Sequence, residues 1–196
     1  MKTEFFEIVD ANDEVIGRAP RSECHGNPEL VHRVAHVLVF SRRGDLLLQK
    51  RAASKDIQPG KWDTSVGGHL DPGEDYRQAA VREMQEELGI DNVPLTFLYK
   101  STIRNETESE NVATFLTCFD GPINFCRTEI SETRFWSATE IERHLGQGLF
   151  TPNFEEEWQM WCDWQRRYLF ADYERLGVCS GGTFPDLFQR IEDNCV

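Results

Sequence analysis

The stretch of sequence that decides the fold is Gly68–Ile90, which reads GHLDPGEDYRQAAVREMQEELGI. A helix is predicted over its second half, Asp75–Leu88, because apolar residues recur there at intervals of four. Asp75 and Gln78, three residues apart, are predicted to form a capping box at the helix start, and Gly89 stands where a left-handed residue ends a helix. The residues expected to face the core, with Val81 beside them, are Tyr76, Ala80, Met84 and Leu88.

Three carboxylates share one face of this predicted helix, largely away from its apolar side. Glu83, Glu86 and Glu87 fall within a sector about 100° wide. If that face is exposed, like charges four residues apart cost only a few tenths of a kcal/mol, so a solvated acidic face is one interpretation. In a cleft, charges about 4 Å apart repel by roughly 4 kcal/mol, which calls for a cation or a proton. Three carboxylate ligands suit Mg²⁺, with Mn²⁺ as a substitute.

The order and spacing of this stretch resemble the Nudix box, G-x5-E-x7-R-E-U-x-E-E-x-G-U, in which U is an aliphatic or similar residue. Every fixed position is matched, and Met84 and Ile90 fill the U positions. The resemblance implies an α/β fold of the Nudix type, an α/β/α sandwich with a mixed sheet. It also implies a hydrolase that cleaves a diphosphate bond in a nucleoside diphosphate derivative or related small diphosphate. The metal ligands it implies are the Gly68 carbonyl, Glu83, Glu86 and Glu87.

The same resemblance assigns further roles within the box. Arg82 is expected to orient a glutamate through charge-assisted hydrogen bonds, while Glu74 supports the turn into the helix. A carboxylate must take a proton from the attacking water, and Nudix enzymes draw this base either from the box or from a later loop. The box candidates are Glu87 and Glu86. An acidic loop is predicted over Arg104–Asn111, and its candidates are Glu106, Glu108 and Glu110, the last ranked first because a strand follows it.

A second resemblance, to isopentenyl-diphosphate isomerase, is carried by residues 49–69, QKRAASKDIQPGKWDTSVGGH. It implies that Arg51 and Lys55 hold a diphosphate. It also implies a second metal site, whose five ligands would be His25, His32, His69, Glu108 and Glu110. His36, in a predicted strand, is interpreted as a packed or hydrogen-bonded residue.

The sequence also departs from the isomerase pattern. Gly67 stands where the isomerase has a reactive cysteine, and glycine has no side chain to act as an acid or nucleophile. The helix carboxylates, which isomerases tend to lose in part, are all present. A hydrolase of the isomerase-like sub-branch is therefore favoured, with the isomerase itself and a catalytically silent Nudix-fold binding module as alternatives.

The rest of the chain predicts one Nudix-like domain over residues 1–196, with a core at about 31–165, an N-terminal β-hairpin at 1–30 and a C-terminal helical extension at 166–196. A helix capped by Ser137 is expected over Ser137–Leu145. Strands are predicted at Phe5–Val9, Leu30–Ser41, Leu46–Lys50, Leu95–Ile103, Val112–Phe119 and residues 135–136. An aromatic stripe in the tail is interpreted as core packing: Phe154, Trp158, Trp161, Trp164 and Tyr168.

Composition narrows the classes of partner. With 21 Lys and Arg against 34 Asp and Glu, the net charge is −13, which argues against a nucleic-acid polymer or an anionic membrane surface. The apolar runs are too short to span a bilayer, and six cysteines without a C-x-x-C pair favour reduced thiols in the cytoplasm. The basic segment Arg42–Lys61 would attract an anionic substrate despite the negative net charge of the chain. Two surfaces are candidates for a homodimer contact, the hairpin and Trp158–Tyr168.

Overall fold

The computed structural model describes residues 4–55 and 57–176, the last nine of them (168–176) as backbone only. The described residues form two compact units. The first consists of residues up to Leu38, Ser65–Thr117 and Ile123–Cys126, and the second consists of Val39–Thr64, Cys118–Pro122 and residues from Arg127 onward. The division of the sequence into a core and two terminal extensions stays a prediction.

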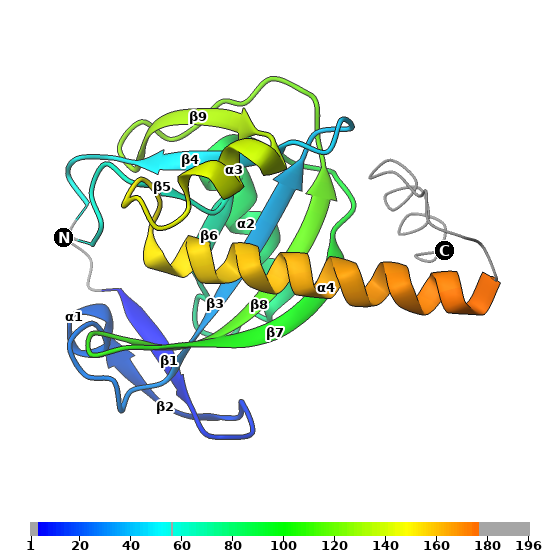
Figure 1. Ribbon diagram of the computed structural model, residues 1–196. Helices are drawn as coiled ribbons and strands as arrows, with labels where there is room; N and C mark the ends of the chain where they lie inside the picture. The colour runs from blue at the N-terminus through cyan, green and yellow to red at the C-terminus, as the bar shows by residue number, and fades with distance from the viewer. Residues whose placement is uncertain (1–3, 56, 177–196) are drawn as a thin grey trace. The chain divides into compact units, whose positions relative to one another are not determined.

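The first unit begins with the expected hairpin, drawn in blue in Figure 1. Strand β1 (Phe5–Val9) pairs antiparallel with β2 (Val15–Pro20), and a single helical turn, α1 (Arg21–Cys24), follows. The Asp10 side chain accepts the N–H groups of Asn12 and Glu14, which closes the turn between the strands. Ile8 pairs with His32 at the start of the next strand, so the hairpin joins the sheet of this unit through β1.

The sheet of the first unit continues through β3 (His32–Phe40), β6 (Val66–His69), β7 (Thr96–Arg104) and β8 (Ser109–Cys118). β3, whose last two residues belong to the second unit, pairs with β6 and β8, and β8 also pairs with β7. β6 was not predicted, because the sequence VGGH is short and its two glycines are typical of a turn.

The expected loop Arg104–Asn111 is shorter in the structure. Arg104 pairs with Ser109 across the β7–β8 hairpin, so only residues 105–108 lie outside the strands and Glu110 lies within β8. The Asn105 side chain accepts the N–H groups of Thr107 and Glu108, which makes a tight turn. The run of polar residues concealed this strand start.

Helix α2 (Tyr76–Leu88) is capped as predicted. The Asp75 side chain accepts the Gln78 N–H, the Gln78 side chain accepts the Asp75 N–H, and Gly89 ends the helix in the left-handed region at φ 67°. The expected core face was wrong at Val81, which is 42% exposed. The buried residues of the helix are Ala79, Ala80, Met84, Glu87 and Leu88.

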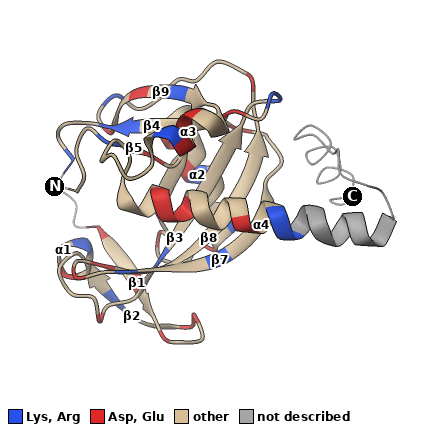
Figure 2. Ribbon diagram, viewed as in Figure 1, with Lys and Arg blue, Asp and Glu red and all other residues tan. Residues whose placement is uncertain are grey.

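The second unit contains β4 (Leu46–Arg51), β5 (Trp62–Asp63), β9 (Ile130–Trp136), α3 (Ala138–His144) and α4 (Pro152–Leu176). β4 pairs antiparallel with β5 and β9. Ser137 caps α3 as predicted, in a capping box with Glu140. Figure 2 shows an acidic band near the start of α4 and a basic band further along it.

The aromatic stripe of α4 is largely core, as interpreted. Phe154, Trp158 and Trp161 are buried, and Trp164 is half-buried and stacks on Trp161. The side chain of Tyr168 lies outside the described part of the structure. The helices and the mixed sheet confirm the α/β class. Across residues 4–55 and 57–176, no helix combines the length and apolarity that crossing a bilayer requires.

Candidate functional site

Gly68 and Glu83 are packed directly on each other. A Cβ atom added to Gly68 of β6 would stand 2.0 Å from Cδ of Glu83 and 2.3 Å from its Oε1. The Glu83 side chain, 16% exposed, therefore occupies the space that any other residue at position 68 would need. The backbone of Gly68 and one carboxylate of α2 lie side by side, which brings together two of the implied metal ligands.

Arg82 organises the acidic groups around this point. Its guanidinium donates five hydrogen bonds: two to the Glu74 carboxylate, one each to Glu83 and Glu86, and one to the His69 carbonyl. The bond with Glu74 is the main reason that the pKa of each partner moves, lowered for Glu74 and raised for Arg82. Arg82 thus fixes the β6–α2 turn through Glu74 and holds two of the helix carboxylates, Glu83 and Glu86.

The burial of the helix carboxylates distinguishes a solvated acidic face from a metal-binding one. Glu83 and Glu87 follow Ala79 at intervals of four, so they lie on the buried side of α2 rather than away from it. The whole residue Glu87 is only 8% exposed, whereas the Glu86 side chain is 61% exposed. Burying carboxylates is unfavourable without compensation by cations or hydrogen bonds. A merely solvated acidic face does not describe Glu83 and Glu87.

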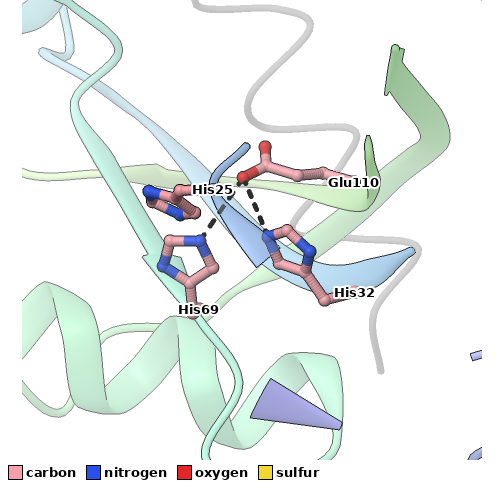
Figure 3. Close-up of side chains that lie close together, drawn as sticks. All are labelled: His25, His32, His69 and Glu110. Atoms are coloured by element: carbon pink, nitrogen blue, oxygen red, sulfur yellow. Dashed lines mark ion pairs between the residues drawn. The ribbon is translucent and has the colours of Figure 1, made fainter. Parts of the chain in front are cut away.

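A second cluster joins four side chains from four separate segments of the first unit (Figure 3). His25 follows α1, His32 begins β3, His69 ends β6 and Glu110 is the second residue of β8. One ligand atom from each lies within 4.8 Å of the others. Oε1 of Glu110 is 3.4 Å from Nε2 of both His32 and His69.

The imidazole nitrogens of this cluster suit a metal ion. Within the described part of the chain, Nε2 of His25, His32 and His69 are buried and make no hydrogen bond. Nδ1 of His32 donates to the Leu30 carbonyl at 3.1 Å, an arrangement that, in the metal-binding form of the ring, places the lone pair on Nε2. Burial, together with the nearby His69 and Arg21, lowers the pKa of His25 to about 4, and burial lowers the pKa of His69 as well. Neutral imidazoles are the form that binds metals.

Of the two late glutamates, the structure brings only Glu110 into this cluster. Burial alone would raise the pKa of Glu110. The neighbouring His32 and His69 rings outweigh burial and hold this pKa well below its ordinary value. Glu108 is buried, yet its carboxylate is not among the converging groups, and Glu106 is exposed in the turn. The expected set of five is therefore four in this structure.

One residue at this cluster, Phe6, was not identified by sequence analysis. Its ring stacks on His69 with centroids 4.0 Å apart and on His32 with centroids 5.0 Å apart. An apolar residue in a short strand is indistinguishable from ordinary core without the register of β1, so no sequence signal could have identified it.

The backbone N–H of Gly26 donates to the Thr107 carbonyl at 2.7 Å, which holds the segment that carries His25 near the start of β8.

Gly67 and His36 are directly opposite each other in the β3–β6 ladder. The side chains of opposite residues in a ladder lie beside each other on one face of the sheet. His36 therefore lies beside position 67, where the isomerase resemblance implies a cysteine. His36 is buried, as interpreted, at 9% exposure.

The basic pair Arg51 and Lys55 lies in the second unit and has partners there. Arg51 donates to Asp63 at 2.9 Å and to the Ile57 carbonyl, and Lys55 pairs with Glu129 at 2.5 Å. A phosphate that bound either cation would have to compete with these carboxylates.

Comparisons with known proteins agree with the box. The family model described as the NUDIX domain matches residues 30–162. An uncharacterized Nudix hydrolase of Yersinia pestis is 34% identical over 160 residues, which cover 81% of this chain and 85% of the relative. An isopentenyl-diphosphate Delta-isomerase of Streptomyces avermitilis is 35% identical over 147 residues, which cover 70% of this chain and 74% of the relative.

A solved structure shares the fold as well. The crystal structure of DR0079 from Deinococcus radiodurans superposes with a TM-score of 0.70 at 24% identity, and the match covers 80% of this chain and 98% of that one. Relatives of both names confirm the resemblance to the isomerase-like branch. The chain is thus a member of the Nudix hydrolase family.

Proposed function

We propose that this protein is a Mg²⁺-dependent hydrolase that cleaves the phosphoanhydride bond of a nucleoside diphosphate derivative or a related small diphosphate. The observation that carries the proposal is the packing of the Glu83 carboxylate on Gly68. The backbone of Gly68 thus lies against a carboxylate on the face of α2 that also carries Glu87. Hard oxygen donors of this kind are the ligands that Mg²⁺ prefers, and Mn²⁺ is the expected substitute.

The residues of the box divide the work of the reaction. Gly68, Glu83, Glu86 and Glu87 would hold the metal, which when bound neutralises the diphosphate and lowers the pKa of a coordinated water. Arg82 and Glu74 keep the carboxylates oriented. Water attacks one phosphorus, a carboxylate receives its proton, and the bridging oxygen leaves with the other phosphate.

The proton acceptor is assigned to the box, to Glu86 or Glu87. Glu110, which the sequence ranked first among the loop candidates for the base, lies close to three imidazoles. We propose instead that Glu110 joins His25, His32 and His69 in holding a second metal. A set of three imidazoles and one carboxylate suits a borderline ion such as Mn²⁺ or Zn²⁺ better than Mg²⁺. Arg51 and Lys55 remain the proposed contacts for substrate phosphate, and the cytosol the proposed compartment.

The test is a panel of nucleoside diphosphate derivatives incubated with Mg²⁺ and assayed for release of phosphate or nucleoside monophosphate. Glu83→Gln and Glu87→Gln are each expected to lower kcat by about 10²–10⁴-fold. Glu142→Gln, on the exposed face of α3, serves as the control and should retain full activity. Unchanged turnover in both box variants would remove the proposed roles. Between Glu86→Gln and Glu87→Gln, the base is the one that loses kcat while the affinity for Mg²⁺ is retained.

A second candidate, isopentenyl-diphosphate isomerase, is favoured by the His25–His32–His69–Glu110 cluster and by the relatives of that name. Incubation with isopentenyl diphosphate should give no dimethylallyl diphosphate, because Gly67 provides no reactive group. Formation of that product at a rate typical of enzymes, about 1 s⁻¹ or more, would favour the isomerase over the hydrolase.

A further inference from the structure

We propose that Phe6 is a positioning residue for the second metal: its ring fixes the planes of His69 and His32 and thereby sets the affinity and geometry of the ion they hold. The inference rests on the proposed metal role of the His25–His32–His69–Glu110 cluster. It adds the N-terminal hairpin, through one side chain, to the machinery of that site.

The stacking geometry carries the argument. The Phe6 ring is nearly parallel to the His69 ring, at 11° with centroids 4.0 Å apart, and nearly parallel to the His32 ring, at 17° and 5.0 Å. Phe6 is 2% exposed, so its ring also keeps water from the imidazole faces. A face-to-face contact limits rotation of an imidazole about its Cβ–Cγ bond, the motion that would turn Nε2 away from a shared ion.

The hydrogen bonds of His32 and His69 show why contact with the Phe6 ring matters. Metal-binding histidines are usually oriented by an Nδ1–H group that donates to an oxygen. His32 has this arrangement with the Leu30 carbonyl. Among the described residues, no oxygen is recorded as accepting from Nδ1 of His69, and the ion pair of its ring is with Glu110, at Nε2. Contact with Phe6 takes the place of the missing hydrogen bond at His69.

Phe6 is itself held firmly. It pairs with Ala19 in the β1–β2 ladder, and two residues later in the same strand Ile8 pairs with His32. The Arg21 guanidinium lies 5.9 Å from the centre of the Phe6 ring, and the Arg21 N–H donates to the Glu4 carbonyl. Because the Phe6 ring is fixed by its strand, it can restrict the orientation of the His69 and His32 imidazoles.

The experiment titrates the full-length protein, freed of metal and kept in excess Mg²⁺, with Co²⁺ and follows visible absorption. Phe6→Leu and Phe6→Met both keep apolar bulk but remove the flat ring. We expect the dissociation constant for Co²⁺ to rise about 10–100-fold in both variants, with a change in the shape of the absorption band. Ile8→Val is the matched control, because Ile8 belongs to the same apolar cluster on the same strand and shows no ring contact with a histidine. It should leave the dissociation constant within twofold.

The outcomes separate the two proposals. If the wild type shows no Co²⁺ absorption that His25→Ala abolishes, the metal site itself fails and the role of Phe6 falls with it. If the wild type binds Co²⁺ at the cluster and both Phe6 variants bind it with unchanged affinity and spectrum, only the role of Phe6 is overturned. Equal weakening in Ile8→Val would likewise reduce Phe6 to an ordinary core residue.

Discussion

The backbone of Gly68 and its lack of a side chain both matter to the proposed chemistry. Gly68→Ala introduces a Cβ atom 2.0 Å from Cδ of Glu83, so the carboxylate must move. We expect kcat for diphosphate hydrolysis to fall about 10²-fold, because misplacement of a catalytic group by about 1 Å has effects of this size. Gly17→Ala is the control, since nothing lies within 4 Å of its added Cβ. Full activity of Gly68→Ala would show that the Glu83 position is not required.

Asp13 gives a prediction about pH. Burial would raise the pKa of its carboxyl, but hydrogen bonds from Lys100, Asn111 and Tyr76 outweigh burial and lower it. A group with a lowered folded-state pKa stabilises the fold above its unfolded pKa, and this stability is lost as pH falls through the folded value. Asp13→Asn, which tolerates the left-handed φ of 67° at this position, should therefore cost about 1 kcal/mol at pH 7 and progressively less below pH 3.8.

Urea unfolding at pH 7 and near pH 3 measures this difference. Asp91→Asn, at an exposed position after α2, should match the wild type at both pH values. A deficit for Asp13→Asn that stays constant across this range would assign its role to shape rather than charge.

Helix α2 depends on its N-cap residue, Asp75. Asp75→Ala removes the side chain that accepts the Gln78 N–H and should lower the free energy of unfolding by about 1 kcal/mol. Asp75→Asn should restore most of it, because asparagine caps helices about as well. Thermal unfolding of the three proteins gives the comparison, and equal midpoints would mean that the cap is dispensable. Hydrolysis well below the midpoint should be unchanged.

Helix α4 is expected to owe its position to its aromatic side chains. Trp161 is 2% exposed and packs on Phe40, with ring centroids 5.0 Å apart. Trp161→Ala should destabilise the protein by about 3–5 kcal/mol, and Trp164→Ala by clearly less, because Trp164 is only half-buried. Denaturant unfolding measures both, and equal losses would contradict the core interpretation.

The elements also show what a sequence alone can predict. The bounds and caps of α2 could be predicted because capping chemistry is local, within three or four residues. The buried face was misjudged at Val81 because small residues such as Ala79 let the helix approach its neighbours on a side that also carries glutamates. The start of β8 was missed because its residues are polar, although it pairs with the nearby end of β7. Strands β5 and β6 were missed because they are short and their pairing partners are distant in sequence. For the same reason, the contact of Phe6 with the histidines could not be foreseen, although the motif identified the histidines themselves.

The cluster of His25, His32, His69 and Glu110 predicts that metal binding stabilises the folded protein. An ion held by residues from four segments of the first unit binds the folded state only, and at 100 times its dissociation constant it should add about 2.7 kcal/mol of stability. Unfolding midpoints with Mn²⁺ or Zn²⁺ should exceed those in chelator. The difference should vanish in His69→Ala and persist in His144→Ala, whose imidazole lies in α3. No change on chelation would argue against a bound ion.

The short strand β6 places consecutive residues in two proposed sites: the backbone of Gly68 lies against Glu83, while the imidazole of His69 points into the histidine cluster and its carbonyl accepts from Arg82. A one-residue slip of β6 would turn every side chain to the opposite face. Insertions or deletions there would consequently disable both sites together, whereas substitutions in α2 or β8 alter one at a time. Evolution can tune the two sites separately only by leaving the spacing of β6 untouched.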